Sequence, residues 1–144
     1  MSADGIREDP RLLVGGWRLD RTLVDRAAGL RGCLHGNLIV EARPDGQLRW
    51  FESGTMTWAG RAAPASRTYL IGETPEGWWM FFSDGRPFHP WRPGRAVRHD
   101  CVADVYTGVV DIRSRAEVSV RWEVHGPAKD HVYRTRLRRA VPAE

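Results

Sequence analysis

The chain has 144 residues, of which 42% are hydrophobic and seven are Trp. This length is enough for one domain with a buried core, and the composition excludes a disordered chain. The net charge is +4, and every basic residue except Lys129 is Arg. Such a high ratio of Arg to Lys, with the Arg residues scattered along the chain, is typical of codon bias in a GC-rich genome. We therefore do not expect nucleic acid as a partner.

The two ends and the cysteines indicate where the protein works. No apolar run approaches the roughly 18 residues of a membrane helix, and the polar start MSADGIREDPRL is not typical of a signal peptide. Two cysteines, Cys33 and Cys101, are too few for a disulfide framework and are expected as free thiols. We therefore expect a cytoplasmic protein with no membrane partner. Its expected parts are a flexible arm at 1–10, one folded domain at 11–140 and a short tail at 141–144.

Alternation of apolar and polar residues with a period of two runs through most of the chain and predicts β-strands. Turn signals separate the runs, and 24–32 is the only segment compatible with a short helix. Eight antiparallel strands with short connections favour a sheet that closes on itself, because closure removes exposed edges. The sequence thus predicts an all-β antiparallel barrel. Its expected strands are 15–24, 33–43, 46–58, 66–73, 77–83, 97–112, 117–126 and 130–139.

The first predicted strand opens with GGW, which resembles the G-x-W signature of lipocalins and the wider calycin superfamily. That resemblance implies that Trp17 plugs the closed end of the barrel. It also implies that an Arg near the end of the last strand packs over this ring: Arg136, Arg138 or Arg139. With ESG, DGR-x-FH, H-x-C-x-x-D-x-Y and GP-x-KD, the chain from about 14 to 139 resembles an uncharacterised family of small bacterial lipocalin-like domains. This resemblance implies a fold and a cavity but no activity.

An eight-stranded barrel has room inside for side chains or one small ligand. The polar groups that face the inside are therefore the ones that would contact a ligand. In the strand 46–58, Glu52 shares a face with Trp50, and a carboxylate inside a barrel needs a partner or a proton. Arg67 and Tyr69 share a face on the next strand, which makes Arg67 a natural bidentate partner for Glu52. Two interpretations stay open: a structural ion pair, or a polar anchor for an acidic or carbonyl-bearing ligand.

The segment 84–106 concentrates side chains that can bind or react. The run before it, WWMFF at 78–82, is apolar on both faces, which is consistent with a covered outer face and a homodimer. The segment 86–95 is predicted as a loop at the mouth of the barrel, where loops commonly gate a cavity. In the strand that follows, a bulge near 102–103 would bring four reactive side chains to one side: His99, Cys101, Asp104 and Tyr106.

Three kinds of chemistry fit these residues. His89, His99 and Cys101 are competent ligands for zinc or iron with Asp104 as a further group, although two ligands spaced i, i+2 on one strand are a loose pattern. A Cys–His nucleophile is disfavoured, because residues two apart on one strand lie about 7 Å apart. An aromatic pocket with a few polar groups suits a small ligand and acid–base chemistry, such as cyclisation, isomerisation or dehydration.

We favour a small-molecule ligand in an aromatic pocket and assign no metal and no cofactor to it. The chain has no dinucleotide fingerprint, no P-loop and no G-x-S-x-G motif. Both a binding protein and an enzyme fit such a pocket. The candidate catalytic residues are Glu52, His89, His99, Cys101, Asp104 and Tyr106. The candidate ligand-binding residues are Trp50, Arg67, Tyr69, Phe82, Arg86, Trp122, Lys129 and Tyr133.

The basic residues near the C-terminus leave two further alternatives. Lys129, unlike Arg, can lose its proton or form a Schiff base, but a salt bridge to Asp104 or Asp130 at a hairpin is favoured. The solvent-facing side of the last strand is expected to carry Arg134, Arg136 and Arg138. An RNA- or protein-interaction barrel that uses this Arg face ranks below a metal-dependent enzyme or sensor.

Overall fold

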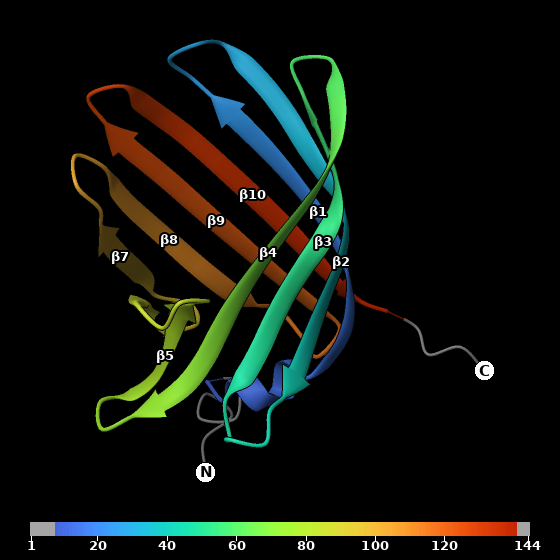
Figure 1. Ribbon diagram of the computed structural model, residues 1–144, viewed down its shortest axis with the longest axis vertical. Coiled ribbons are helices and arrows are strands. Elements are labelled where there is room, and N and C mark those ends of the chain that lie inside the picture. Colours follow the sequence, from blue (N-terminus) through green and yellow to red (C-terminus); the bar gives the residue numbers. More distant parts are fainter. Residues whose placement is uncertain (1–7, 141–144) are drawn as a thin grey trace.

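The computed structural model describes residues 8–140, which form an antiparallel β-barrel (Figure 1). The tail expected at 141–144 and most of the arm expected at 1–10 lie outside the described residues. A single turn of 3-10 helix, η1 (Pro10–Leu13), precedes the strands. The strands are β1 (Gly15–Asp25), β2 (Leu30–Ala42), β3 (Leu48–Trp58), β4 (Arg61–Thr74), β5 (Gly77–Phe82), β6 (Pro87–Pro90), β7 (Ala96–Asp100), β8 (Val105–Ile112), β9 (Glu117–Gly126) and β10 (Lys129–Arg139).

One continuous sheet makes the barrel, in the order β6-β5-β4-β3-β2-β1-β10-β9-β8-β7. Each strand pairs with a neighbour in the chain, and the pairing of β1 with β10 joins the two ends of the sequence. The sheet curls until its edge strands β6 and β7 approach each other. There, Nδ1 of His99 lies 2.9 Å from the carbonyl oxygen of Phe88. The antiparallel barrel predicted from the alternation is confirmed, with ten strands in place of eight.

Trp17, near the start of β1, packs against η1 at one end of the barrel, and its side chain is only 1% exposed. Its indole nitrogen donates to the carbonyl oxygen of Leu13 at 2.9 Å. The guanidinium of Arg139 lies 4.0 Å from the ring centroid of Trp17, and it also donates to the carbonyl oxygens of Leu12 and Val14. Arg139 therefore has the cation–π role that the resemblance left open among three Arg residues.

The predicted faces of the strands agree with the observed burial. On β3, Leu48, Trp50 and Glu52 are buried, and their neighbours Arg49, Phe51 and Ser53 are more exposed. On β10, the three basic residues expected to face solvent are exposed: Arg134, Arg136 and Arg138. The inward residues of β1, β2, β3, β4, β9 and β10 form the core, which includes Leu19, Leu38, Leu48, Ile71, Val118 and Leu137. Strand alternation thus gave the correct inside of the barrel.

The short helix expected at 24–32 is wrong. Strand β1 continues to Asp25 and β2 begins at Leu30, with a hairpin turn between them. Gly29 takes a φ of 67°, and the backbone N–H of Ala28 donates to Asp25 Oδ1 at 3.0 Å. A nine-residue helix is unstable by itself, and the strand pairing on both sides is stronger. Among residues 8–140, no helix is long and apolar enough to cross a membrane.

Two predictions about the segment 86–112 are also wrong. The expected mouth loop at 86–95 contains β6, and Phe88 and His89 in it are buried. The two Pro residues in β6 are tolerated because an edge strand leaves backbone positions unpaired. The expected single strand at 97–112 is a hairpin, in which Cys101 and Asp104 exchange backbone hydrogen bonds of 2.8 and 3.1 Å. The expected bulge near 102–103 is this turn, with Ala103 at a φ of 72°.

Replacing the plug should weaken the fold strongly. The change Trp17→Ala removes a fully buried aromatic ring and its contact with Arg139. We expect the free energy of unfolding to fall by about 3–5 kcal/mol, as measured by urea denaturation. Trp79→Ala, which truncates a half-buried ring outside the cavity, is the matched control and should cost clearly less. Equal losses in the two variants would contradict the role of Trp17 as the plug.

Candidate functional site

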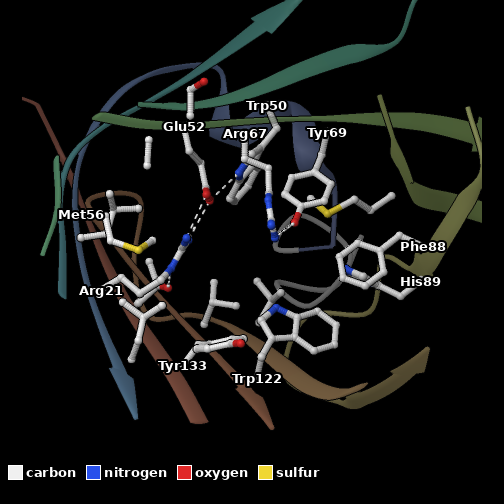
Figure 2. Close-up of a pocket in the computed structure, with 18 of the residues that line it drawn as sticks. Arg21, Trp50, Glu52, Met56, Arg67, Tyr69, Phe88, His89, Trp122 and Tyr133 are labelled. Carbon is white, nitrogen blue, oxygen red and sulfur yellow. Dashed lines mark hydrogen bonds and ion pairs between the residues drawn. The ribbon is translucent and has the colours of Figure 1, made fainter. Parts of the chain in front are cut away.

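A cavity of about 330 Å³ lies inside the barrel (Figure 2). Every strand except β7 contributes to its wall. The residues of the wall that the sequence predicted are Trp50, Glu52, Arg67, Tyr69, His89, Trp122 and Tyr133. Most of the rest is apolar, and includes Leu23, Leu34, Met56, Met80, Phe88, Trp91, Val110 and Val120. An enclosed, mainly apolar space with a few polar groups is the usual form of a small-molecule site.

Glu52 lies on this wall but is fully engaged by protein partners. Its two carboxylate oxygens accept hydrogen bonds from the guanidinium of Arg21 at 3.0 and 2.8 Å, and Oε2 also accepts from the indole of Trp50 at 3.0 Å (Figure 2). Nε of Arg21 donates to the hydroxyl of Thr135 at 2.7 Å. The expected pairing of Glu52 with Arg67 is therefore wrong. The bidentate partner is Arg21, which reaches the carboxylate from β1.

Arg67 instead lies beside Tyr69, its neighbour two residues along β4. Its guanidinium donates to the phenol oxygen of Tyr69 at 3.0 Å, and it makes no ion pair within residues 8–140. Arg67 is exposed to solvent at the edge of the cavity, while Tyr69 is only 9% exposed. Burial raises the pKa of Tyr69, and the charge of Arg67 offsets part of that effect. The phenol of Tyr69 therefore keeps its proton at neutral pH.

The aromatic part of the wall is a stack of rings centred on Phe88. The ring of Phe88 stacks on Phe82 at 4.7 Å, on Trp122 at 5.1 Å and on Tyr69 at 5.5 Å between centroids. Trp122 can lie flat across β8 because its partner there is Gly108, at which a Cβ atom would collide with the ring. These contacts fix a rigid, flat surface against which an aromatic ligand can pack.

His89 is a buried part of this wall. It is 2% exposed, and its Nδ1 lies 2.8 Å from the carbonyl oxygen of Pro90, so that Nδ1 carries the proton and donates it. Burial lowers the pKa of His89, the bond to Pro90 opposes this effect and the nearby His99 adds to it, so that the pKa is about 4. His89 is therefore a neutral imidazole at pH 7. The indole N–H of Trp91, also on the wall, is buried without a hydrogen-bond partner among the described residues.

Other predicted site residues lie outside the cavity wall. Cys101 is exposed in the β7–β8 turn. Lys129 makes a salt bridge of 3.1 Å to Asp104, one of the two partners that the sequence analysis expected for Lys129. Arg86 pairs with Asp84 at 2.7 Å. The remaining three, Phe82, His99 and Tyr106, do not line the cavity, and their rings make edge-to-face contacts with one another or with Phe88. The described residues contain no group of three or more His, Cys, Asp or Glu side chains that could hold a metal. The alternative of a metal site at His89, His99 and Cys101 therefore has no support from the arrangement of these residues.

The sequence analysis missed several polar residues at the cavity. Arg21 and Thr135 complete the ion pair, and Nδ1 of His131 lies 2.7 Å from the hydroxyl of Tyr133. Nε2 of His131 lies 3.4 Å from Oδ2 of Asp25. The period of two that starts at Trp17 places Arg21 on the inner face of its strand, so the sequence could have predicted Arg21 as a residue of the cavity.

The fold and the cavity define the chain as a small antiparallel β-barrel with an internal pocket. Residues 13–139 match the model of a family of unknown function, DUF6314, and the chain belongs to this family. This span is close to the one over which the chain resembles small lipocalin-like domains, and the match does not test the individual motifs. A search of curated proteins found no sequence that matches the chain.

Two solved structures show the same fold at low sequence identity. The S-type phycobiliprotein lyase CPES from Guillardia theta is similar to 99% of this chain over 100% of its own length, with a TM-score of 0.65 and 10% identity. A protein of unknown function from the DUF3598 family of Nostoc punctiforme covers 92% of this chain, with a TM-score of 0.53 and 10% identity. This chain spans 49% of that protein. Both likenesses concern the fold alone.

Breaking the ion pair in the cavity should destabilise the protein. The change Glu52→Gln leaves the charge of Arg21, whose side chain is 19% exposed, without its partner. We expect the free energy of unfolding to fall by about 3 kcal/mol in urea denaturation. Replacing both residues by Leu should restore most of that loss, because buried apolar pairs of similar size are well tolerated.

The matched control for Glu52→Gln is Glu123→Gln, which breaks a 2.6 Å ion pair with Arg121 on the outer surface. Exposed pairs contribute little, so this change should have a small effect. If Glu52→Gln were as mild as the control, the pair with Arg21 would not be a structural requirement.

The burial of His89 should make stability depend on pH. Its pKa is about 4 in the folded protein and about 6.5 when unfolded, so the unfolded state binds the extra proton between these values. Stability is therefore complete above about pH 6.5 and is lost as the pH falls towards 4. Between pH 7 and 5, this group should remove about 2 kcal/mol from the free energy of unfolding. The loss should be absent in His89→Gln and present in the exposed-histidine control His125→Gln. An unchanged loss in His89→Gln would contradict the assignment.

Proposed function

We propose that the barrel binds a small, largely apolar organic molecule that carries a carbonyl or carboxylate group. One observation carries this proposal. Of the charged residues on the cavity wall, Arg67 is the one without a counter-ion among residues 8–140, and it lies next to the phenol of Tyr69. A cation and a hydroxyl donor at the edge of an aromatic pocket suit a ligand with one polar end.

The donors available at this edge support the choice of an oxygen acceptor. A guanidinium has five N–H donors, and Arg67 uses one of them on Tyr69. Because Tyr69 accepts that bond with its oxygen, its own O–H hydrogen can donate to a ligand. Planar guanidinium groups bind carboxylates through two parallel hydrogen bonds. The ligand's oxygen is thus expected between Arg67 and Tyr69.

The rest of the cavity supports an apolar body for the ligand. The stacked rings of Phe88 and Trp122 offer a flat surface, and the buried charges of Arg21 and Glu52 neutralise each other. The volume of about 330 Å³ is at the lower end of the range found for small-molecule sites. The phycobiliprotein lyase with the same fold is consistent with a barrel that serves a small molecule.

Two expectations from the sequence remain part of the proposal. A cytoplasmic location agrees with the free thiols of Cys33 and Cys101. A homodimer agrees with Trp79 and Phe81, which are half-buried on the outer face of β5 next to Leu70. Size-exclusion chromatography with light scattering measures the oligomeric state directly.

The test of binding uses two dyes that share an aromatic body. Anilinonaphthalene sulfonate carries one negative charge, and phenylnaphthylamine is its uncharged counterpart. We expect both to gain fluorescence in the cavity. The change Arg67→Gln should weaken the sulfonate dye about tenfold, which corresponds to about 1.4 kcal/mol for a charged hydrogen bond. It should leave the uncharged dye unaffected, since only the first has a group for Arg67.

The control is Arg49→Gln, which removes an Arg that stacks on Phe51 on the outside of the barrel. This variant should bind both dyes as the original protein does. If neither dye bound, the proposed function would be wrong. Equal weakening of both dyes by Arg67→Gln would mean that Arg67 supports the fold and does not bind the polar group.

A further inference from the structure

Three polar side chains form a line from the cavity wall to the rim of the barrel. The hydroxyl of Tyr133, which lines the cavity, lies 2.7 Å from Nδ1 of His131. Nε2 of His131 lies 3.4 Å from Oδ2 of Asp25. The register between β1 and β10 pairs Asp25 with His131 and Leu23 with Tyr133, so the two strands hold this line in place. Asp25 and His131 are 18% and 21% exposed, so the outer end of the line meets solvent.

The arrangement determines which atoms carry protons. The carboxylate of Asp25 favours a proton on the nearer nitrogen of His131, which is Nε2. The other nitrogen, Nδ1, then has a lone pair that accepts the O–H of Tyr133. Asp25 is itself held by the turn, because its Oδ1 accepts the backbone N–H of Ala28 at 3.0 Å. A hydroxyl, a histidine and a carboxylate in this order match the general arrangement in which a base activates a hydroxyl group.

The surroundings of Tyr133 keep its phenol protonated in the absence of a base. Burial raises the pKa of Tyr133, as do the neighbouring Tyr106 and the charge of Asp25, while Lys129 and Arg67 act in the opposite direction. The hydrogen bond between the two side chains places Nδ1 of His131 where it can take the phenol proton as Tyr133 accepts one from a ligand. His131 is the group that makes this transfer available inside the cavity.

The wall opposite Tyr133 carries the oxygen-binding groups of the proposed function. Figure 2 shows Arg67 and Tyr69 on one side of the cavity and Tyr133 with Trp122 on the other. A ligand whose oxygen lies between Arg67 and Tyr69 would therefore extend its carbon skeleton across the cavity. Donors placed where negative charge develops on a carbonyl oxygen stabilise an enolate, the intermediate of proton removal beside a carbonyl group.

We infer that the barrel catalyses a proton-shift isomerisation of an apolar, unsaturated carbonyl compound, with Tyr133 as the catalytic acid–base residue and His131 and Asp25 as the residues that position and activate it. This inference rests on the proposed function, because it takes the carbonyl oxygen to be bound by Arg67 and Tyr69. It requires no cofactor and no second substrate.

The step balances within these residues. A C–H bond next to the carbonyl breaks and its proton passes to the oxygen of Tyr133, while the phenol proton passes to Nδ1 of His131. The C–H electron pair forms a new carbon–carbon double bond, and the carbonyl π pair moves to the oxygen, where Arg67 and Tyr69 donate to it. The ligand already holds a carbon–carbon double bond one carbon further on, so the intermediate is a dienolate. The proton then returns from His131 through Tyr133 to the far carbon of that double bond, and the carbonyl re-forms. The net change is the position of one double bond.

The experiment measures proton removal directly, without knowledge of the natural ligand. The probe is β-tetralone, an aromatic ketone whose hydrogens next to the carbonyl exchange with deuterium oxide and can be followed by NMR. We expect the protein to accelerate this exchange above the buffer rate. The change Tyr133→Phe should lower the saturated rate about 100-fold or more, with the dissociation constant, from quenching of Trp fluorescence, unchanged within about twofold.

The variants of the positioning residues separate this role from a structural one. His131→Gln should also lose most of the exchange, and Asp25→Asn should lose about tenfold because its amide places the wrong proton on His131. Asn keeps the oxygen that accepts the N–H of Ala28, so the melting temperature should change little. His125→Gln, an exposed histidine on β9, should leave the exchange rate as it is.

The possible outcomes are distinct. Binding of β-tetralone without accelerated exchange would overturn the catalytic inference and leave the binding function intact. Equal acceleration by Tyr133→Phe would overturn the role of Tyr133. Binding of the two dyes without binding of β-tetralone would overturn the carbonyl class of substrate and the inference with it. If none of the three probes bound, the proposed function itself would be wrong.

Discussion

The ion pair of Arg21 and Glu52 determines the electrostatics inside the barrel. A buried carboxylate costs several kcal/mol unless its oxygens are hydrogen-bonded, and here Arg21 meets both oxygens while Trp50 adds a third donor. Because this pair is neutral as a unit, the uncompensated charge at the cavity is that of Arg67, at its exposed edge. A single cation beside a neutral, aromatic space is the reason for proposing a ligand with one polar end.

The alternation of residues predicted most of this barrel because each long strand has one face in the core. In strands with alternating residues, such as those that contain Trp50 and Trp122, only one pairing register buries the apolar face. The errors lie where this rule fails. Strand β6 is short, has Pro at both ends and buries the adjacent Phe88 and His89, so that no period is visible. The turn at 101–104 has Ala103, and not Gly, at its position of positive φ, so that the sequence signal for a turn is weak there.

The sequence predicted which types of residue line the candidate site, but it did not predict which of these side chains contact each other. Period two brings Glu52, Tyr69 and Tyr133 inside, and an inward Glu needs a cation. Which cation meets it depends on side-chain reach across the barrel, and the sequence offered Arg67 on the adjacent strand. Arg21, which lies 31 positions before Glu52, was the residue that reached it. The contact of Asp25 with His131 likewise depends on the closure of β1 against β10, which no local pattern contains.

The crowding of reactive side chains at 84–106 has a structural explanation in the seam of the barrel. Within the described residues, β6 and β7 are the two edges of the sheet, and no backbone ladder joins them. Exposed edges of this kind need other partners for their polar groups. His99 supplies one by contacting the carbonyl oxygen of Phe88, and Lys129 with Asp104 ties two turns together beside it. The contact of His99 thus bridges a seam that lacks the ladder hydrogen bonds of the paired strands. The polar groups that we propose to act in the cavity lie instead on the long strands β1, β4 and β10, whose register is fixed along their length.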